Sequence, residues 1–190
     1  MQNYDGMNYA PKGKPKPVCK EGEFIFAAAA LDHGHIYGMC NGLTEAGGTI
    51  KYVFDPDPEK VARFVKAFPQ AKPVTQLEAI LCDQSIHMVA GAAVTSERCA
   101  LGLKVMDSGK DYFTDKAPLT SLEQLESARN KAKETGKKYA VYYSERIHNE
   151  SAVFAGQLIK IGAIGRVVQV MGLGPHRLRA SKSISVSAGM

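Results

Sequence analysis

The segment 24–38, FIFAAAALDHGHIYG, constrains the fold of this 190-residue chain more than any other stretch. Its first eight residues form a continuous apolar run. The run stops at Asp32, and apolar residues then recur at three- and four-residue steps, which is typical of a helix. This order predicts a buried parallel strand, a tight polar turn and a helix, the start of a βαβ unit. Such a turn directs backbone N–H groups and the positive end of a helix dipole to one place, which suits a dinucleotide pyrophosphate.

The rest of the chain alternates short apolar runs with helical patterns. The expected strands are 24–31, 49–54, 73–75, 86–90, 111–114 and 139–143. The expected helices are 35–46, 59–68, 76–82, 96–108, 121–135 and 150–161. Short strands that alternate with helices predict an α/β fold with a doubly wound parallel sheet of the Rossmann type and right-handed crossovers.

Several helix ends carry capping signals. Asp57 before Pro58 predicts an N-cap with proline at the first helical position. Thr75, with Glu78 three residues later, predicts a capping box for the helix 76–82. Gly136 predicts the C-terminal cap of the helix 121–135.

Composition excludes several classes of protein. With 45% hydrophobic residues the chain can form a core, yet no run approaches the roughly 18 apolar residues that span a bilayer. The first residues are polar and rich in Pro, Gly and Lys, without the hydrophobic segment of a signal peptide. We therefore expect a cytoplasmic protein without a membrane partner.

The net charge of +5 is spread along the chain, except for a cluster of lysines among prolines in residues 1–22. This composition predicts an extended, solvated arm. Because no basic stripe with interleaved aromatics follows, we expect no nucleic-acid partner. The four cysteines are far apart and form no CxxC pair, so we expect buried, reduced thiols that bind no metal.

Polar residues follow several of the expected strands. In a doubly wound sheet the carboxyl ends of the strands line the ligand crevice. These ends should therefore meet although they are distant in sequence. The residues expected to bind a cofactor there are Leu31, Asp32, His33, Gly34, His35, Asp55, Ala93, Val94, Asp115 and Lys116.

Asp55 closes the second strand roughly 20 residues after the first turn, where an acidic residue commonly binds the ribose hydroxyls of the adenosine. A carboxylate there repels a 2′-phosphate, which favours NAD over NADP. The alternative is that Asp55 only nucleates the Asp-Pro turn that follows it.

The glycine fingerprint of the first turn is weak, because the glycines expected near Ala30, Asp32 and His35 are absent. A carboxylate beside a pyrophosphate is unfavourable, so Asp32 should turn away or cap the helix through the N–H of Gly34 or His35. Asp32, His33 and His35 also suggest a metal site. We expect no metal, because histidines two apart in a turn rarely reach one ion and no third ligand is evident.

Lys116 follows the fifth strand. A lysine at that position can bond a substrate hydroxyl and help to move its proton during hydride transfer. The alternative is a surface lysine paired with Asp115.

Three longer strings carry a resemblance. They are GKDYFTDKAPL at 109–119, YYSER at 142–146 and FAGQLIKIGAIGRVV at 154–168. They resemble, in turn, the "GK-x-V-x-x-EKP" segment, the strand ending in an arginine and the "L-I-x-x-G-x-I-G-x-V" lead of the glucose-fructose oxidoreductase / inositol dehydrogenase (Gfo/Idh/MocA) family.

The resemblance implies a nicotinamide-dependent oxidoreductase whose small-molecule substrate is a sugar, a polyol or a similar hydroxylated compound. Lys116 takes the place of the family's EKP lysine, Asp115 that of its glutamate, and Arg146 that of the arginine at the cofactor. Ala117 departs from the pattern, since the proline stands one step later at Pro118.

The resemblance also implies a second, α+β domain that supplies the substrate pocket, of which we expect only the first strand, 165–172. The expected division is an arm at 1–22, a dinucleotide-binding domain at 23–146, a crossover helix and truncated second domain at 147–180, and an irregular tail at 181–190. His176 is a candidate for the acid/base that the family's second domain provides. A lone strand invites pairing, so we expect a homo-oligomer or a separate chain that supplies the missing domain.

Two hypotheses follow. The first is the cofactor part of an NAD-dependent oxidoreductase, with NADP less favoured. The second is a catalytically silent Rossmann-like module that associates through residues 167–170.

Overall fold

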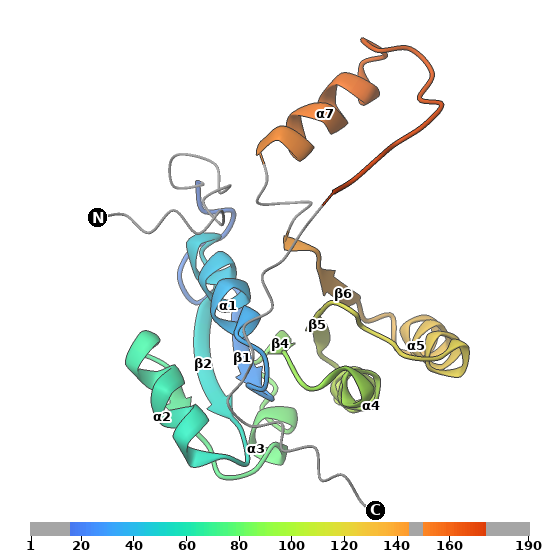
Figure 1. Cartoon of the computed structure of the whole chain (residues 1–190). Helices are drawn as coiled ribbons and strands as arrows, with labels where there is room; N and C mark the ends of the chain where they lie inside the picture. The colour runs from blue at the N-terminus through green and yellow to red at the C-terminus, as the bar shows by residue number, and fades with distance from the viewer. Residues whose placement is uncertain (1–15, 145–149, 174–190) are drawn as a thin grey trace, which may run out of the picture.

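Six parallel strands form one sheet in the order β3-β2-β1-β4-β5-β6 (Figure 1). The computed structural model describes residues 16–144 and 150–173. The strands are β1 Ile25–Ala29, β2 Thr49–Phe54, β3 Lys72–Pro73, β4 Met88–Gly91, β5 Asp111–Asp115 and β6 Tyr139–Tyr142. The helices are α1 His35–Glu45, α2 Pro58–Ala67, α3 Glu78–Leu81, α4 Arg98–Asp107, preceded by a 3₁₀ turn at Thr95–Glu97, α5 Leu122–Thr135 and α7 Glu150–Lys160. The predicted doubly wound α/β fold is confirmed.

The alanine-rich strand β1 lies in the centre of the sheet and is buried on both faces. Phe26 and Ala28 face one hydrophobic cluster, while Ala27 and Ala29 face the other. Helices α1 and α2 cover the first face, where Ile36 and Phe64 are fully buried. Helices α3 and α4 pack on the opposite face. The continuous apolar run therefore marks a strand with a helical layer on each side.

Two predicted helix caps, the N-cap Asp57 and the C-cap Gly136, are confirmed, and the capping box at Thr75 is wrong. The Asp57 side chain accepts a hydrogen bond from the Glu59 N–H at 2.8 Å, and the residue after Asp57 is Pro58. Ser121 caps α5, which ends at Gly136 in the left-handed conformation. Helix α3, however, begins at Glu78 without a side-chain cap, so the capping box at Thr75 does not form. The expected helix 76–82 is shortened to one turn, too short for its end to be set by local sequence alone.

The segment after the sheet differs from expectation. Helix α7 stands clear of the sheet (Figure 1), and Phe154 and Ile159 on it are exposed. The expected strand 165–172 is not a strand in the structure. A strand needs a hydrogen-bonded neighbour, and in the described parts of the chain none lies beside this segment. Arg146 and His176 lie outside the described residues.

The cysteines are all free, but only Cys40 and Cys99 are buried, whereas Cys82 is exposed. The expectation of four buried thiols is therefore wrong for Cys82. Among residues 16–144 and 150–173, no helix has the length and apolarity required to cross a membrane.

Candidate cofactor-binding site

The carboxyl ends of β1, β2, β4 and β5 lie at one edge of the sheet, hereafter the carboxyl edge, because the strands are parallel. The chain leaves β1 toward β2 on one side and continues from β4 to β5 on the other, so the strand order reverses between β1 and β4. Such a switch point is where α/β proteins of this topology bind their ligands.

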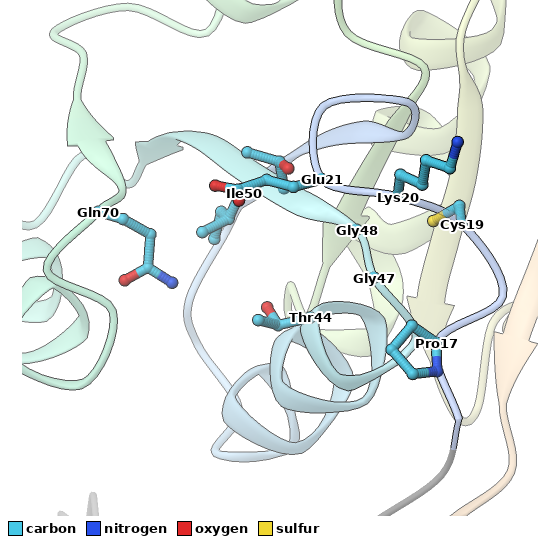
Figure 2. A pocket seen from close by; sticks show the side chains of 10 residues that line it. Pro17, Cys19, Lys20, Glu21, Thr44, Gly47, Gly48, Ile50 and Gln70 are labelled. Atoms are coloured by element: carbon cyan, nitrogen blue, oxygen red, sulfur yellow. The ribbon is translucent and has the colours of Figure 1, made fainter.

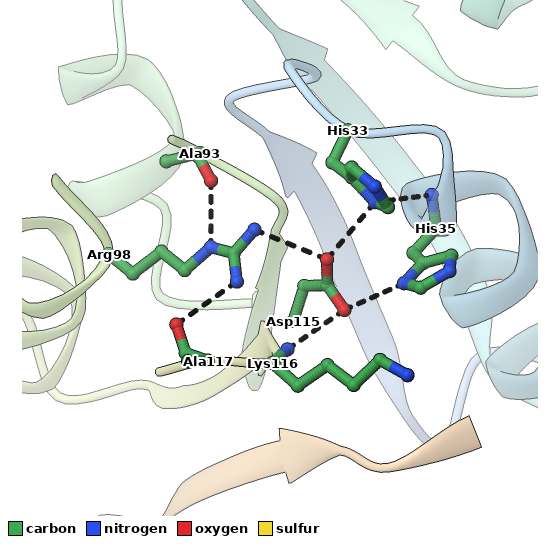
Figure 3. Close-up of polar contacts among 7 residues, drawn as sticks. All are labelled: His33, His35, Ala93, Arg98, Asp115, Lys116 and Ala117. Carbon is green, nitrogen blue, oxygen red and sulfur yellow. Dashed lines mark hydrogen bonds and ion pairs between the residues drawn. The ribbon is translucent and has the colours of Figure 1, made fainter. Parts of the chain in front are cut away.

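Asp115, the last residue of β5, is the centre of a polar cluster at this edge (Figure 3). Its side chain is 1% exposed. One carboxylate oxygen lies 2.9 Å from Nδ1 of His35 and accepts the backbone N–H of Lys116 at 2.8 Å. The other lies 3.1 Å from Nδ1 of His33. The first turn and the end of β5, 80 residues apart in sequence, are thus joined directly.

Arg98, the first residue of α4, holds the same carboxylate from the opposite side. Its NH2 group donates to Asp115 at 3.2 Å, its Nε to the carbonyl of Ala93 at 2.7 Å and its NH1 to the carbonyl of Ala117 at 3.0 Å. The guanidinium therefore connects the end of β4 to both sides of the Lys116 peptide and neutralises a buried charge.

The two histidines differ in their environment. The side chain of His33 is 53% exposed and that of His35 is 29% exposed, and their rings meet edge to face at 4.3 Å. Partial burial, followed by the neighbouring His35, lowers the pKa of His33, which favours its neutral form near pH 7. The reason for expecting no metal at this turn is wrong, because Asp115 supplies the missing third ligand atom.

Asp55 faces inward. Its side chain is 1% exposed, and its oxygens accept the N–H of Leu31 at 2.6 Å and the N–H of Asp57 at 2.9 Å. This geometry supports the alternative in which Asp55 shapes the turns after β1 and β2. In the structure its carboxylate presents no exposed face for a ribose.

Asp32 does not cap α1. Its carboxylate accepts a hydrogen bond from Lys60 at 2.6 Å, and the Lys60 ammonium also lies 3.8 Å from Asp55. The N–H of His35, which Asp32 was expected to bind, donates instead to Nδ1 of His33 at 3.3 Å. The negative charge of Asp32 at the turn is therefore balanced by a lysine that the sequence reasoning missed.

The turn itself retains two features of an anion site. Gly34, the N-cap of α1, carries no side-chain cap, and the space where a Cβ would stand is open. Ala30 has φ +55°, a left-handed conformation that favours glycine, and this is one of the positions where the fingerprint requires glycine. At Ala30, therefore, the left-handed conformation that favours glycine is present without the glycine.

The remaining predicted site residues lie at the same edge. Ala93 is buried and binds Arg98 through its carbonyl, whereas the side chain of Val94 is 48% exposed. Lys116 follows β5 and precedes a cis peptide bond to Ala117. Its side chain extends from the cluster on the side where His35 lies (Figure 3).

A hollow of about 600 Å³ lies at the opposite edge, near the amino end of β2 (Figure 2). Its lining includes Cys19 and Lys20 from the N-terminal segment, Thr44 from α1 and the pair Gly47 and Gly48. The Cys19 thiol donates to the carbonyl of Ala46. Glu21 also lies in its lining, but none of the residues predicted to bind the cofactor does.

Sequence reasoning missed Arg98 and Lys60. Arg98 opens the helix after β4, and a basic residue there can reach the end of either neighbouring strand. The signal was the acidic residue at the end of β5, which needs a cation once it is buried.

A sequence profile of the Gfo/Idh/MocA family, described as "Oxidoreductase family, NAD-binding Rossmann fold", matches residues 28–143. A D-xylose dehydrogenase from Paenarthrobacter nicotinovorans is 25% identical over 113 residues, which are 60% of this chain and 29% of that protein.

Solved structures give the same fold. An enzyme from Erwinia carotovora atroseptica SCRI1043, whose assignment as an oxidoreductase is itself provisional, superposes with a TM-score of 0.81 and 45% identity. The match covers 85% of this chain and 48% of the other. A levoglucosan dehydrogenase bound to NADH and levoglucosan is 18% identical, with a TM-score of 0.65 over 75% of this chain and 40% of its own. The chain therefore spans less than half the length of these proteins.

Proposed function

Because the chain belongs to the Gfo/Idh/MocA oxidoreductase family with its NAD-binding Rossmann fold, we propose that its carboxyl edge binds a nicotinamide dinucleotide for hydride transfer. The observation that carries the proposal is the meeting of the uncapped start of α1 with the Asp115–Lys116 end of β5. Bound nicotinamide supplies the hydride acceptor or donor.

The residues of the first turn fit a pyrophosphate. The positive end of the α1 dipole and the open space above Gly34 favour an anion at this turn, where the N–H of His35 would exchange its bond to His33 for one to the pyrophosphate. Lys60 balances Asp32 and so reduces the repulsion that the carboxylate would exert. Val94, exposed at the end of β4, offers an apolar surface to a ring.

Lys116 is the residue proposed to act on the substrate. In the oxidation direction its neutral amine would accept the hydroxyl proton as the hydride leaves the same carbon, and in the reverse direction the resulting ammonium would return that proton to the oxygen. Arg98 and Asp115 fix the backbone on both sides of Lys116, which restricts where its side chain begins. Arg146 and His176 remain proposals from the sequence.

We propose a sugar or polyol as the substrate class, in line with the D-xylose dehydrogenase among the relatives. NAD is the proposed cofactor, in line with the NAD-binding description of the family, while the inward-facing Asp55 adds only a buried negative charge nearby. Lys60 lies 3.8 Å from Asp55 and offsets part of that charge, so both cofactors belong in the test.

The test is a titration of NADH and NADPH by fluorescence or calorimetry. Saturable NADH binding is expected, and its absence at about 1 mM would contradict the proposal. Val94→Asp should weaken NADH binding at least about tenfold, because a carboxylate replaces the apolar surface proposed to contact a ring of the cofactor. Val18→Asp, at an 85% exposed position of the N-terminal segment, is the matched control and should leave the affinity unchanged.

Turnover requires a second measurement. Lys116→Ala should abolish oxidation of sugars such as D-xylose while it leaves NADH affinity nearly intact. Loss of both would instead place Lys116 in cofactor binding alone.

A second candidate function is association without catalysis. Val168, Val170 and Leu173 are each more than four-fifths exposed in the segment after α7. Exposed apolar runs of this kind mark surfaces that bind another chain. A size measurement combined with the NADH titration separates the two candidates, because only the second expects assembly without cofactor affinity.

A further inference from the structure

Two imidazole nitrogens and a carboxylate converge at the carboxyl edge in a way that cofactor binding does not require. His33, His35 and Asp115 each offer one ligand atom, and these three atoms lie within 4.8 Å of one another. We propose that these three side chains bind a divalent first-row transition-metal ion, with Zn²⁺ as the best-fitting ion.

The donor set supports this assignment. Zinc bound by three protein ligands through nitrogen and oxygen at about 2.0–2.2 Å keeps a fourth position for water. Ligand atoms around such an ion stand about 3.4 Å apart. The observed separations of 2.9 Å and 3.1 Å between the histidines and Asp115 need only a small expansion to admit it.

Nδ1 of His33 lies 3.3 Å from the backbone N of His35 and 3.1 Å from an oxygen of Asp115. A neutral imidazole nitrogen without a proton has one lone pair in the plane of the ring. An ion bound by Nδ1 and by the carboxylate would use this lone pair in place of the contact with the His35 N–H.

The ligands are held in place before any ion arrives. Asp115 is fixed from behind by Arg98 and by the N–H of Lys116. The N–H of His33 donates to the carbonyl of Ala92 at 3.0 Å, which ties the turn to the end of β4. Outer contacts of this kind orient metal ligands and raise affinity.

The expected metal affinity depends on how easily an ion reaches the site and on the charge of its ligands. The side chain of His33 is 53% exposed, so an ion can reach its ring from solvent. Arg98 already balances the only anionic ligand, so the site should bind more weakly than one with two carboxylates. Imidazole ligands nevertheless favour zinc and its neighbours over calcium or magnesium.

The test uses chelator-treated, nucleotide-free protein titrated with Zn²⁺ by calorimetry and with Co²⁺ by visible absorption. The wild-type chain should bind one ion, and the cobalt spectrum should report nitrogen and oxygen ligands without thiolate. His33→Gln, at an exposed position, should weaken binding at least about tenfold. His35→Gln should do the same.

Cys82→Ser is the matched control, because Cys82 is an exposed thiol that could capture zinc on its own. This variant should bind like the wild type, and circular dichroism should show that all variants remain folded. The proposal is overturned if the wild type shows no saturable binding up to about 1 mM. It is equally overturned if both histidine variants bind as tightly as the wild type.

Discussion

The guanidinium of Arg98 and the carboxylate of Asp115 form an ion pair at 3.2 Å whose side chains are 4% and 1% exposed. It joins the start of α4 to the end of β5. Because both charges are out of water, each depends on the other for its stability in the fold. His33, His35 and the backbone N–H of Lys116 all contact the carboxylate that Arg98 holds in place.

Removing the cation of that pair should destabilise the protein strongly. Arg98→Ala leaves the carboxylate of Asp115 buried without its guanidinium, and we expect the free energy of unfolding to fall by about 3–5 kcal/mol. Urea unfolding at neutral pH measures the change. Lys104→Ala, at an exposed position of the same helix, should stay within about 0.5 kcal/mol of the wild type. Equal effects of the two substitutions would show that the pair contributes no stability.

Gly102 in α4 has no room for a side chain. A Cβ there would stand 2.6 Å from ring carbons of both Tyr112 and Tyr139. Gly102→Ala should therefore lower the free energy of unfolding by about 1–3 kcal/mol through overpacking. Gly42→Ala, in a helix position with open space, should instead raise it by about 0.5–1 kcal/mol. Thermal unfolding of the two variants should give shifts of opposite sign.

Ala30 occupies a left-handed conformation, with φ +55°. Ala30→Gly should raise the free energy of unfolding by about 0.5–1 kcal/mol, because the relief of steric strain exceeds the added entropy of the unfolded chain. Ala28→Gly, in the regular part of β1, should have the opposite effect. Chemical denaturation distinguishes them, and a loss of stability in both would refute the strain argument.

Asp83 should make part of the stability dependent on pH. The Lys51 ammonium, 2.5 Å away, and then Ser85 hold the pKa of Asp83 well below its usual range. A lowered carboxyl pKa stabilises the fold above the unfolded-state value, and that stability is lost as the pH falls. Asp83→Asn should therefore be less stable than the wild type at pH 7, with a difference that shrinks below about pH 4. A difference independent of pH would rule out the ionised carboxylate as its source.

Asp32 should limit cofactor affinity. Its carboxylate lies at the turn proposed to hold a pyrophosphate, and Lys60 balances it. Asp32→Asn removes the negative charge and should tighten NADH binding by up to about tenfold, equivalent to about 1.4 kcal/mol. Lys60→Ala should weaken it. Calorimetric titration of both variants checks the signs, and the same sign for both would contradict the charge argument.

The fold could be predicted from the sequence because its signals are local. The apolar run of β1, the proline after Asp57 and the glycine at Gly136 each act within a few residues. The prediction failed where structure depends on a distant partner. The segment 165–172 has strand-like residues, yet in the described structure it lacks the neighbouring strand that would hold it extended.

The site was predicted only in part for the same reason. Parallel strands bring their carboxyl ends together, so the meeting of the first turn with Asp115 follows from topology. Which side chains pair there does not follow, because pairing depends on rotamers and burial. In the structure, Asp32 pairs with Lys60, and the two histidines pair with Asp115.

The methyl groups of β1 act as a spacer between the two helical layers. Ala27, Ala28 and Ala29 are at most 1% exposed and carry only methyl side chains, so the helices on the two faces can pack closely against the sheet along this line. Any larger residue would push one layer outward. Helix α1 starts only six residues after β1 ends, so such a displacement would also move the first turn of α1. The size of the β1 side chains therefore affects the geometry of the carboxyl edge.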